Sequence, residues 1–519
     1  MENLTRAQII AQSVFPRLAA DRFREEGQYR ETIEQLVQKG VGGFCVMSGT
    51  PAQVAGVIAE LQQQAPRPLL FAADFEWGLP MRLEGGTPFP NAYALSVAND
   101  EPLTFRVAEC IAREAQAIGI RWIFAPVTDV LLEPQNVVIG VRSFGANVQT
   151  VVRHSVPFLQ GIQHHQLLAC AKHFPGHGAT TTDSHHHLPI VRQTLQELSS
   201  NELMSFAAAV QYGVRSVMVG HVAYPLLEPD EAIVPASLSP TIVRHLLREQ
   251  LGYDHLVVTD ALDMAAVTEW GTVAAAIVQA KQVGNDVLLM PPDPMEAITV
   301  LQTAVEDGVV DFASFEATLE RLEAARQYVG LLGEPPVEPQ LAVEEHRRVA
   351  LVAAQRALRW ADDRKPDCLP LDRWEEIAVL AFVDNDPDMG YATYAFQYIP
   401  QFYDRECHVG YLDHTITDED ITRLQDHLLT SETLVFLIFA THRAQALLQH
   451  RERIAAVIQA FRQDRPAIAV IFGNPVMGEQ LPVDGILYTY SFTEPSIVTA
   501  LASLFEVEQV KSNKTGESK

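Results

Sequence analysis

The sequence predicts a mixed α/β protein in which a TIM-like (β/α)8 barrel is followed by a smaller α/β sandwich domain. Two observations lead to this prediction. Short apolar runs alternate with longer segments of helical periodicity through the first two thirds of the chain, and several runs end abruptly in a polar residue. Buried parallel strands are nearly continuous apolar runs. Because functional residues of a TIM barrel stand at the carboxyl ends of its strands, polar residues are expected there.

The barrel strands are expected in seven apolar runs. These are residues 41–47, 69–74, 120–126, 168–174, 216–221, 256–260 and 286–290. Between them lie segments with apolar residues at three- and four-residue spacing, which is typical of helices; examples are 31–39, 105–117 and 274–282. Seven such units fit a barrel better than a doubly wound sheet, although no eighth strand is obvious in the sequence.

The barrel is expected to span residues 1–332, where a helix over 311–332 closes it. Residues 333–340 are rich in proline and predict a linker, because proline and glycine both end helices. A helix near 341–360 and four further apolar runs predict the sandwich domain over 341–510; the runs are 377–383, 434–440, 467–472 and 485–490. Residues 511–519 are polar and are expected to be disordered.

The composition of the chain disfavours several classes of binding partner. The 519-residue chain has a formal net charge of −27, which disfavours nucleic acid and anionic membranes because they carry the same sign. Its five cysteines are scattered without a CxxC pair, so neither a disulfide framework nor a structural zinc site is expected. The first seventeen residues lack the pattern of a signal peptide, and no apolar stretch approaches the roughly 20 residues of a membrane span. We therefore expect a cytoplasmic protein without a membrane partner.

The densest polar segment is KHFPGHGATTTDSHHHLP at residues 172–189. It begins at the end of a predicted strand and continues as a loop that contains five histidines. Pro175 and Gly176 exclude a helix between His173 and His177, which would be needed to bring both onto one face as metal ligands. We therefore predict neither a metal nor a cofactor, and we expect His186 and His187 to belong to a solvated loop.

This segment resembles the signature KHFPGHGxxxxDSHxxLP of family 3 glycoside hydrolases, in the β-N-acetylglucosaminidase branch. Three other segments agree in order and spacing. Residues 73–82, ADFEWGLPMR, resemble the family's D-x-E-x-G-x-x-x-R stretch. Residues 138–145, VIGVRSFG, resemble its R-S-F-G loop, and residues 257–264, VVTDALDM, resemble the strand that carries its nucleophile. The resemblance covers roughly residues 10–330.

The resemblance implies three catalytic residues. Asp260 corresponds to the family's nucleophile, and a carboxylate at a strand end suits attack on an anomeric carbon. His185 corresponds to the acid/base of this branch, with Asp183 as the partner that orients its imidazole. The simpler alternatives are an Asp260 that caps the following helix and an Asp183 that forms a loop turn.

Six further residues are predicted to bind substrate. Five of them follow from the resemblance, namely Asp74, Arg82, Arg142, Lys172 and His173. His221 is added because it ends the predicted strand 216–221. For Arg82 the simpler alternative is a surface salt bridge.

The predicted function is the retaining exo-hydrolysis of terminal β-linked N-acetylglucosamine from oligosaccharides or muropeptides, through a glycosyl-aspartate intermediate. Muropeptides would fit a role in cell wall recycling, and chitin-derived substrates are equally compatible. The alternatives are an N-acetylglucosaminide phosphorylase, a β-glucosidase-type family 3 hydrolase and a non-enzymatic sugar-binding protein. The sandwich domain is expected to supply no catalytic residue, and the sequence does not indicate an oligomeric state.

Overall fold

The computed structural model describes residues 4–180, 187–331, 341, 343–363, 365–371, 376–405 and 407–505. The chain forms two compact units. The first comprises Met1–Pro88 and Asp100–Val349, and the second comprises Phe89–Asn99 and Ala350–Lys519. The predicted linker at 333–340 and the predicted tail at 511–519 lie outside the described residues.

The first unit contains a curled parallel sheet. Seven strands run in the order β2-β3-β4-β5-β6-β7-β8, and β9 pairs in parallel with β1. Their bounds are β1 Val14–Phe15, β2 Arg17–Ala19, β3 Gly43–Ser48, β4 Leu70–Ala73, β5 Trp122–Ile123, β6 Leu168–Phe174, β7 Ser216–Val219, β8 Leu256–Thr259 and β9 Leu288–Leu289. Each of the seven predicted runs overlaps one of β3 to β9, so the α/β class and the parallel sheet are confirmed.

The strand that the sequence did not reveal is β1 together with β2, which only Pro16 separates. The amide of Cys45 donates to the Pro16 carbonyl at 2.9 Å, and a parallel bridge joins Val258 of β8 to Val287 beside β9. Backbone pairing therefore continues from β8 through β9 and β1 to β2. The side chains enclosed by the strands form an apolar core around Trp122, whose indole Nε1 donates to Ser216 Oγ at 2.7 Å.

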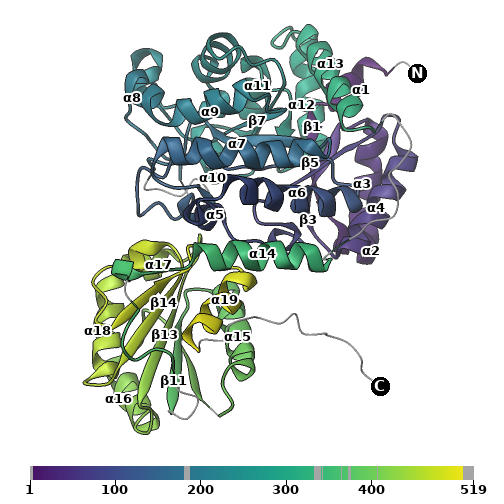
Figure 1. Cartoon of the computed structure of the whole chain (residues 1–519). Helices are drawn as coiled ribbons and strands as arrows, with labels where there is room; N and C mark the ends of the chain where they lie inside the picture. Colours follow the sequence, from purple (N-terminus) through teal and green to yellow (C-terminus); the bar gives the residue numbers. More distant parts are fainter. Residues whose placement is uncertain are drawn as a thin grey trace, which may run out of the picture. The chain divides into compact units, whose positions relative to one another are not determined.

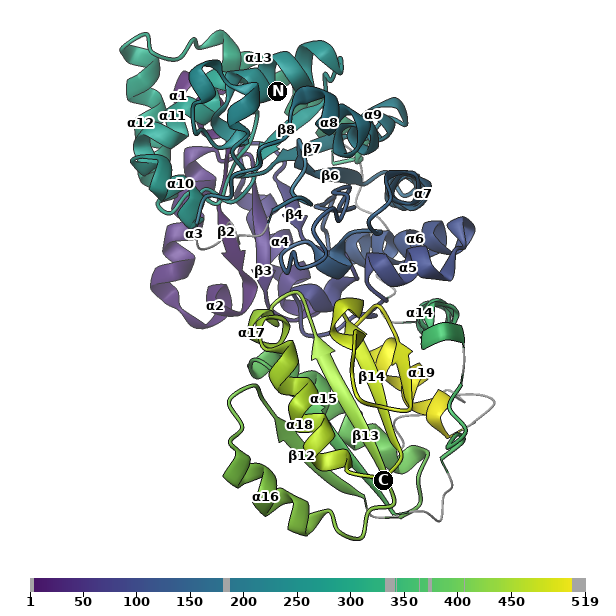
Figure 2. The same cartoon turned by 90° about the vertical axis from the view of Figure 1, so that its left-hand side faces the viewer.

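Helices surround this sheet (Figures 1 and 2). They are α1 Arg6–Ala11, α2 Ala20–Glu25, α3 Gly27–Lys39, α4 Pro51–Gln64, α6 Glu101–Ala117, α7 Val148–His164, α8 Leu195–Ser200, α9 Glu202–Gln211, a π-type helix Thr241–Gln250, α10 Ala265–Trp270, α11 Val273–Val283, α12 Pro294–Glu306 and α13 Ala313–Tyr328. Local sequence explains several of their ends. Thr50 caps α4 through the Gln53 amide with Pro51 at the first helical position, and α3 ends at Gly40 with φ 88°.

The second unit has a six-stranded sheet in the order β10-β15-β14-β13-β11-β12, in which only the β10–β15 pair is antiparallel. The strands are β10 Arg359–Trp360, β11 Ile377–Phe382, β12 His408–Leu412, β13 Thr433–Ala440, β14 Ala467–Gly473 and β15 Gly485–Tyr488. Helices α15 and α19 cover one face and α16, α17 and α18 the other (Figure 1). Their bounds are α15 Asp386–Tyr398, α16 Asp418–His427, α17 Gln445–Gln449, α18 Arg451–Arg462 and α19 Glu494–Leu504. The helix α14, Glu344–Ala357, begins in the first unit and ends in the second.

A short segment from the first part of the sequence belongs to the second unit. It contains α5, Ala92–Ala98. The side chain of Asn91 accepts from Ser491 Oγ at 2.9 Å, and the rings of Tyr93 and Tyr490 stack with centroids 5.4 Å apart. Residues 89–99 were expected within the barrel, and these contacts group them with the second unit instead. Across the described ranges, no helix combines the length and apolarity that a membrane-spanning segment needs.

Candidate active site

Polar side chains gather at the carboxyl ends of four strands of the first unit. Asp74 follows β4, Lys172 and His173 lie in β6 just before its last residue, His221 comes after β7, and Asp260 directly follows β8. Because the carboxyl ends of parallel strands meet at one edge of a sheet, the fold brings these residues to the same edge. The strand-end pattern seen in the sequence therefore has a common location in the structure.

Five charged side chains form a continuous network at this edge. The Lys172 Nζ lies 2.8 Å from Asp74 Oδ1 and 2.8 Å from Glu76 Oε1. Arg82 donates to Asp74 Oδ2 at 2.6 Å, and Arg142 binds Glu76 through two nitrogens at 2.9 and 2.8 Å. Arg82 is therefore part of a largely buried network and not of a surface salt bridge. Sequence reasoning singled out four of the five residues and left out Glu76.

The charges of this network hold one another in the ionised state. Burial alone would raise the pKa of the Asp74 carboxyl, but the nearby Lys172 and Arg82 cations hold it far below its usual value. Arg142 and Lys172 lower the pKa of Glu76 against its own burial in the same way. The carboxylates in turn raise the pKa of Lys172 and Arg142 despite burial. The network therefore offers fixed charges, which suit hydrogen bonds to neutral hydroxyl groups, and does not titrate near neutral pH.

His173 is oriented by a buried aspartate. Its Nδ1 lies 2.7 Å from Asp129 Oδ2, and its backbone amide donates to the same oxygen at 3.0 Å. The other ring nitrogen, Nε2, lies 3.4 Å from the Arg142 guanidinium. Since Asp129 accepts at Nδ1 and Arg142 donates at Nε2, the hydrogen bonds assign the Nδ1–H tautomer to His173.

The loop after β6 is anchored from two sides. The amide of His177 donates to Asp129 Oδ1 at 2.7 Å, and the amide of Gly178 donates to Glu202 Oε1 at 2.8 Å. Burial lowers the pKa of His177 to about 4, so its imidazole is neutral near pH 7. The Thr180 hydroxyl lies 2.9 Å from His177 Nδ1. The part of the loop that precedes residue 181 is therefore firmly held.

Asp260 is partly exposed and stands directly after β8. Its amide donates to the Val219 carbonyl at 2.9 Å, and its Oδ1 accepts from the Ala261 amide at 2.8 Å. The following helix, α10, has Met264 at its N-cap position, so the alternative role of Asp260 as a helix cap is not what the structure shows. A carboxylate with one oxygen bonded to a backbone amide is oriented for chemistry at the strand edge.

His221 is fully buried and contacts the residue that follows Asp260. Its Nε2 lies 3.0 Å from the Ala261 carbonyl oxygen and its Nδ1 lies 2.7 Å from Ser237 Oγ. Burial lowers the pKa of His221. Both ring nitrogens are therefore engaged by the protein, and one of them fixes the backbone that follows Asp260.

The remaining predicted residues, Asp183 and His185, lie outside the described residues, as does His186. His187, on the far side of that gap, is 71% exposed and its Nδ1 lies 2.8 Å from Glu269 Oε1, as expected for a solvated loop. Within the ranges that the structure describes, no cluster of three or more His, Cys, Asp or Glu side chains is placed to hold a metal ion.

Comparison with known proteins identifies the family. The model of the glycosyl hydrolase family 3 N-terminal domain matches residues 8–325. The chain belongs to glycosyl hydrolase family 3. The family predicted from the four sequence segments is thus confirmed.

Relatives of this family 3 chain match either most of it or about half of it. A β-N-acetylglucosaminidase/β-glucosidase of Cellulomonas fimi is 27% identical over 493 residues, which are 89% of this chain and 86% of that protein. A β-hexosaminidase of Xylella fastidiosa (strain M23) is 35% identical over 270 residues, 50% of this chain and 79% of that protein. The structure of a family 3 β-N-acetylglucosaminidase from Paenibacillus sp. str. FPU-7 has a TM-score of 0.86 at 29% identity and covers 97% of both chains. The structure of the β-glucoside phosphorylase BglX, at 19% identity and a TM-score of 0.83, shares the fold.

Several residues that build the site of this family 3 protein were not foreseen. Glu76 stands within the D-x-E stretch, so its spacing from Asp74 was a usable signal. Asp129 and Glu202 carried no such signal, because their importance comes from burial against a loop that is distant in sequence. Asp129 is fully buried and bonds His173 and His177, while Glu202 is fully buried and bonds Gly178.

Proposed function

We propose that the protein is a retaining β-N-acetylglucosaminidase, built on a TIM-like barrel, that removes terminal β-linked N-acetylglucosamine through a covalent intermediate on Asp260. The observation that carries this proposal is the partly exposed Asp260 carboxylate at the strand edge that also holds Asp74, Lys172 and His173. The names of the Cellulomonas fimi, Xylella fastidiosa and Paenibacillus relatives support N-acetylglucosaminide as the substrate class. Family 3 membership supports glycoside hydrolysis.

In the proposed mechanism the charge network binds the terminal sugar and Asp260 attacks its anomeric carbon. Ionised Asp74 accepts hydrogen bonds from sugar hydroxyls, and the cations beside it donate to sugar oxygens. The Ala261 amide donates to Asp260 Oδ1 and so orients the carboxylate, which acts as the nucleophile. A retaining reaction then needs a group that first protonates the departing oxygen and later deprotonates water.

We assign that acid/base role to His185, with Asp183 as its orienting partner, on the D-S-H triplet of the sequence. An imidazole has an ordinary pKa near 6.5 and can serve as both acid and base at neutral pH. The natural aglycone is proposed as an oligosaccharide or a muropeptide, the latter in cell wall recycling. A phosphorylase would transfer the same sugar to phosphate instead of water and could use the same site. An assay with and without phosphate therefore distinguishes the two activities.

The test is the hydrolysis of an aryl N-acetyl-β-glucosaminide and of the matching aryl β-glucoside, each with and without phosphate. We expect release of N-acetylglucosamine at a rate that phosphate does not raise. Asp260→Asn should lower the rate at least about 1,000-fold, since loss of a covalent nucleophile removes several kcal/mol of barrier stabilisation. The matched control is Asp263→Asn, a carboxylate three positions later that pairs with Arg17. Equal rates for wild type and Asp260→Asn would overturn the assignment, and a sugar phosphate product would establish the phosphorylase.

A further inference from the structure

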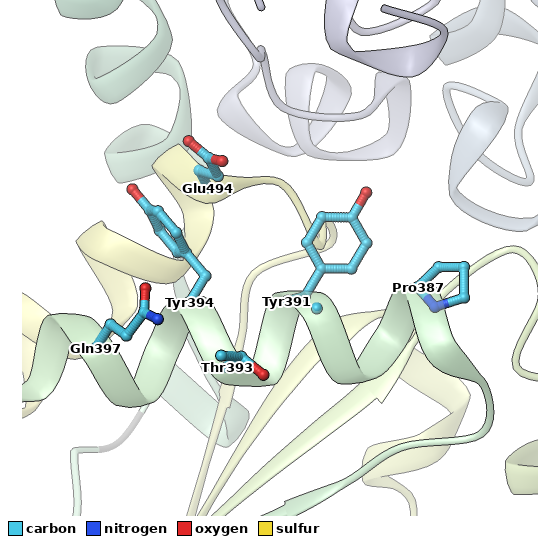
Figure 3. Close-up of a pocket in the computed structure, with 7 residues that line it drawn as sticks. Pro387, Tyr391, Thr393, Tyr394, Gln397 and Glu494 are labelled. Atoms are coloured by element: carbon cyan, nitrogen blue, oxygen red, sulfur yellow. The ribbon is translucent and has the colours of Figure 1, made fainter. Parts of the chain in front are cut away.

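The second unit contains a cavity of about 500 Å³ beside α15 and the start of α19 (Figure 3). Its volume falls within the range of roughly 300–1,000 Å³ that is usual for small-molecule sites. Six lining residues come from α15 and one from α19; they are Pro387, Gly390, Tyr391, Thr393, Tyr394, Gln397 and Glu494. None of them belongs to the candidate active site described above.

Gly390 lines an open part of this cavity. It lies in the interior of α15, and a Cβ added at this position would meet no atom within 4 Å. Its backbone is not in the left-handed region, so no conformational requirement explains the glycine. Glycine is less favourable than alanine inside a helix. Because a Cβ here would meet no neighbouring atom, only a side chain much larger than that of alanine would fill the cavity.

Two tyrosine rings form the aromatic part of the lining. Tyr391 and Tyr394 are partly exposed and extend from the same side of α15 (Figure 3). The ring of Tyr391 packs against the fully buried Phe492 with centroids 5.3 Å apart, and the ring of Tyr394 packs against Tyr398 at 5.1 Å. Both rings are therefore held in place before a ligand arrives, which reduces the entropy that binding would cost. Rigid tyrosines offer an apolar surface with a polar tip.

The polar groups of the lining favour a neutral ligand with hydroxyl and amide groups. The Glu494 carboxyl group lies beside the Tyr394 side chain (Figure 3). Gln397 supplies an exposed amide, whereas the Thr393 hydroxyl is already bonded to the Met389 carbonyl and the Tyr411 hydroxyl. Of the seven lining residues, Glu494 alone is charged, so an anionic ligand would be repelled. A carboxylate, an amide and aromatic rings together match the hydroxyls, the acetamido group and the C–H faces of a sugar.

We propose that this cavity is a second carbohydrate site, which binds one N-acetylglucosamine unit of an oligosaccharide with its ring against Tyr391 and Tyr394. The sugar hydroxyls donate to Glu494, and the acetamido group bonds Gln397. The choice of this particular sugar rests on the proposed function, whereas the neutral sugar class follows from the lining itself. The site would hold an oligosaccharide to the second unit and would take no part in bond cleavage.

Titration calorimetry on the full chain tests this site with a thio-linked β-1,4 oligosaccharide of N-acetylglucosamine, which the enzyme does not cleave. Wild type should bind one more equivalent than Gly390→Phe, whose ring fills the cavity. Tyr391→Ala should weaken the same site at least about tenfold by removing the stacking surface. Gly390→Ala, which adds one methyl group in open space, and Tyr212→Ala, which removes an exposed tyrosine of the first unit, should match wild type.

The aryl N-acetyl-β-glucosaminidase activity separates this proposal from the proposed function. All four variants should keep kcat/KM within about twofold of wild type, which also shows that they fold. If the aryl activity is absent while Gly390→Phe still removes one binding equivalent, the proposed function fails and the second site stands. Equal stoichiometry in wild type and Gly390→Phe would overturn the second site. So would binding of choline at this cavity in place of the oligosaccharide, because it would show a cation site.

Discussion

The carboxyl group of Glu202 accepts a hydrogen bond of 2.8 Å from the Gly178 amide at a position that is closed to solvent. Burial, and secondarily the Asp129 charge, raises the pKa of Glu202 to about 8, and the bond from Gly178 offsets this only in part. A Cβ at Gly176, where φ is +146°, would lie 2.4 Å from Glu202 Cδ. The two glycines of the loop thus fit closely around a carboxyl group that is protonated at neutral pH.

This arrangement predicts how stability depends on pH. The pKa of Glu202 rises from 4.5 to about 8 on folding, so between these values the folded state holds a proton that the unfolded state has released. The contribution of this group is fully present below pH 4.5 and is lost as pH rises towards 8. Glu202→Gln stays neutral throughout. Its free energy of unfolding relative to wild type should therefore increase with pH across this window, by up to about 1.4 kcal/mol per pH unit.

Urea denaturation at several pH values within that window measures the difference. Glu197→Gln is the matched control, because the amide and hydroxyl of Thr194 lower the pKa of Glu197 instead of raising it. The control should show no such rise with pH. A constant difference between Glu202→Gln and wild type would mean that Glu202 is already ionised in the folded protein at neutral pH.

The charge network predicts a large stability cost for removing one carboxylate. Glu76→Gln would leave the largely buried Arg142 without the carboxylate that it binds through two nitrogens, and Lys172 would keep only the Asp74 carboxylate. Breaking a buried ion pair on one side costs about 3–5 kcal/mol, because the remaining charge is buried without compensation. Glu60→Gln removes a carboxylate that pairs with the exposed Arg24 and the partly exposed Arg30, and it should cost about 1 kcal/mol or less. Equal values for the two variants in urea denaturation would contradict this account.

The apolar periodicity of the sequence was enough to predict the parallel sheet but not its first strand. Residues 14–19 contain Pro16 and the exposed Arg17, so they do not form a continuous apolar run. The placement of residues 89–99 could not be predicted either. It depends on Asn91 and Ser491, which are 400 positions apart and make their hydrogen bonds only in the folded second unit. Hydrogen bonds between residues so far apart in the chain produce no recognisable pattern within a short stretch of sequence.

The candidate site was predictable where its residues lie at or just beyond the end of a strand, as Asp74, Lys172 and Asp260 do. A polar residue that stops an apolar run is visible in the sequence. The supporting residues were not visible, because nothing near Asp129 indicates that its carboxylate meets the His177 amide 48 positions later. The hydrogen bonds of such residues arise from the crossing of separate strands and loops, which only the fold supplies.

The assignment of His185 as the acid/base predicts a dependence on the leaving group. A general acid matters when the departing oxygen is a poor leaving group and matters little when it leaves as a stable phenolate. His185→Ala should therefore slow the cleavage of natural disaccharides severely, by about 100-fold or more, and slow aryl glycosides of acidic phenols only mildly. The measurement is the ratio of variant to wild-type rate across phenols of graded acidity.

The same residue should act as the base that releases the sugar from Asp260, so His185→Ala should accumulate glycosyl-enzyme on activated substrates. Azide attacks without a base and should restore turnover by forming a β-glycosyl azide, because a second inversion at the anomeric carbon returns the β configuration. Asp183→Ala, which removes only the orienting partner, should show a weaker form of both effects. A ratio that stays flat across the phenols, together with no effect of azide, would assign the acid/base role to another group.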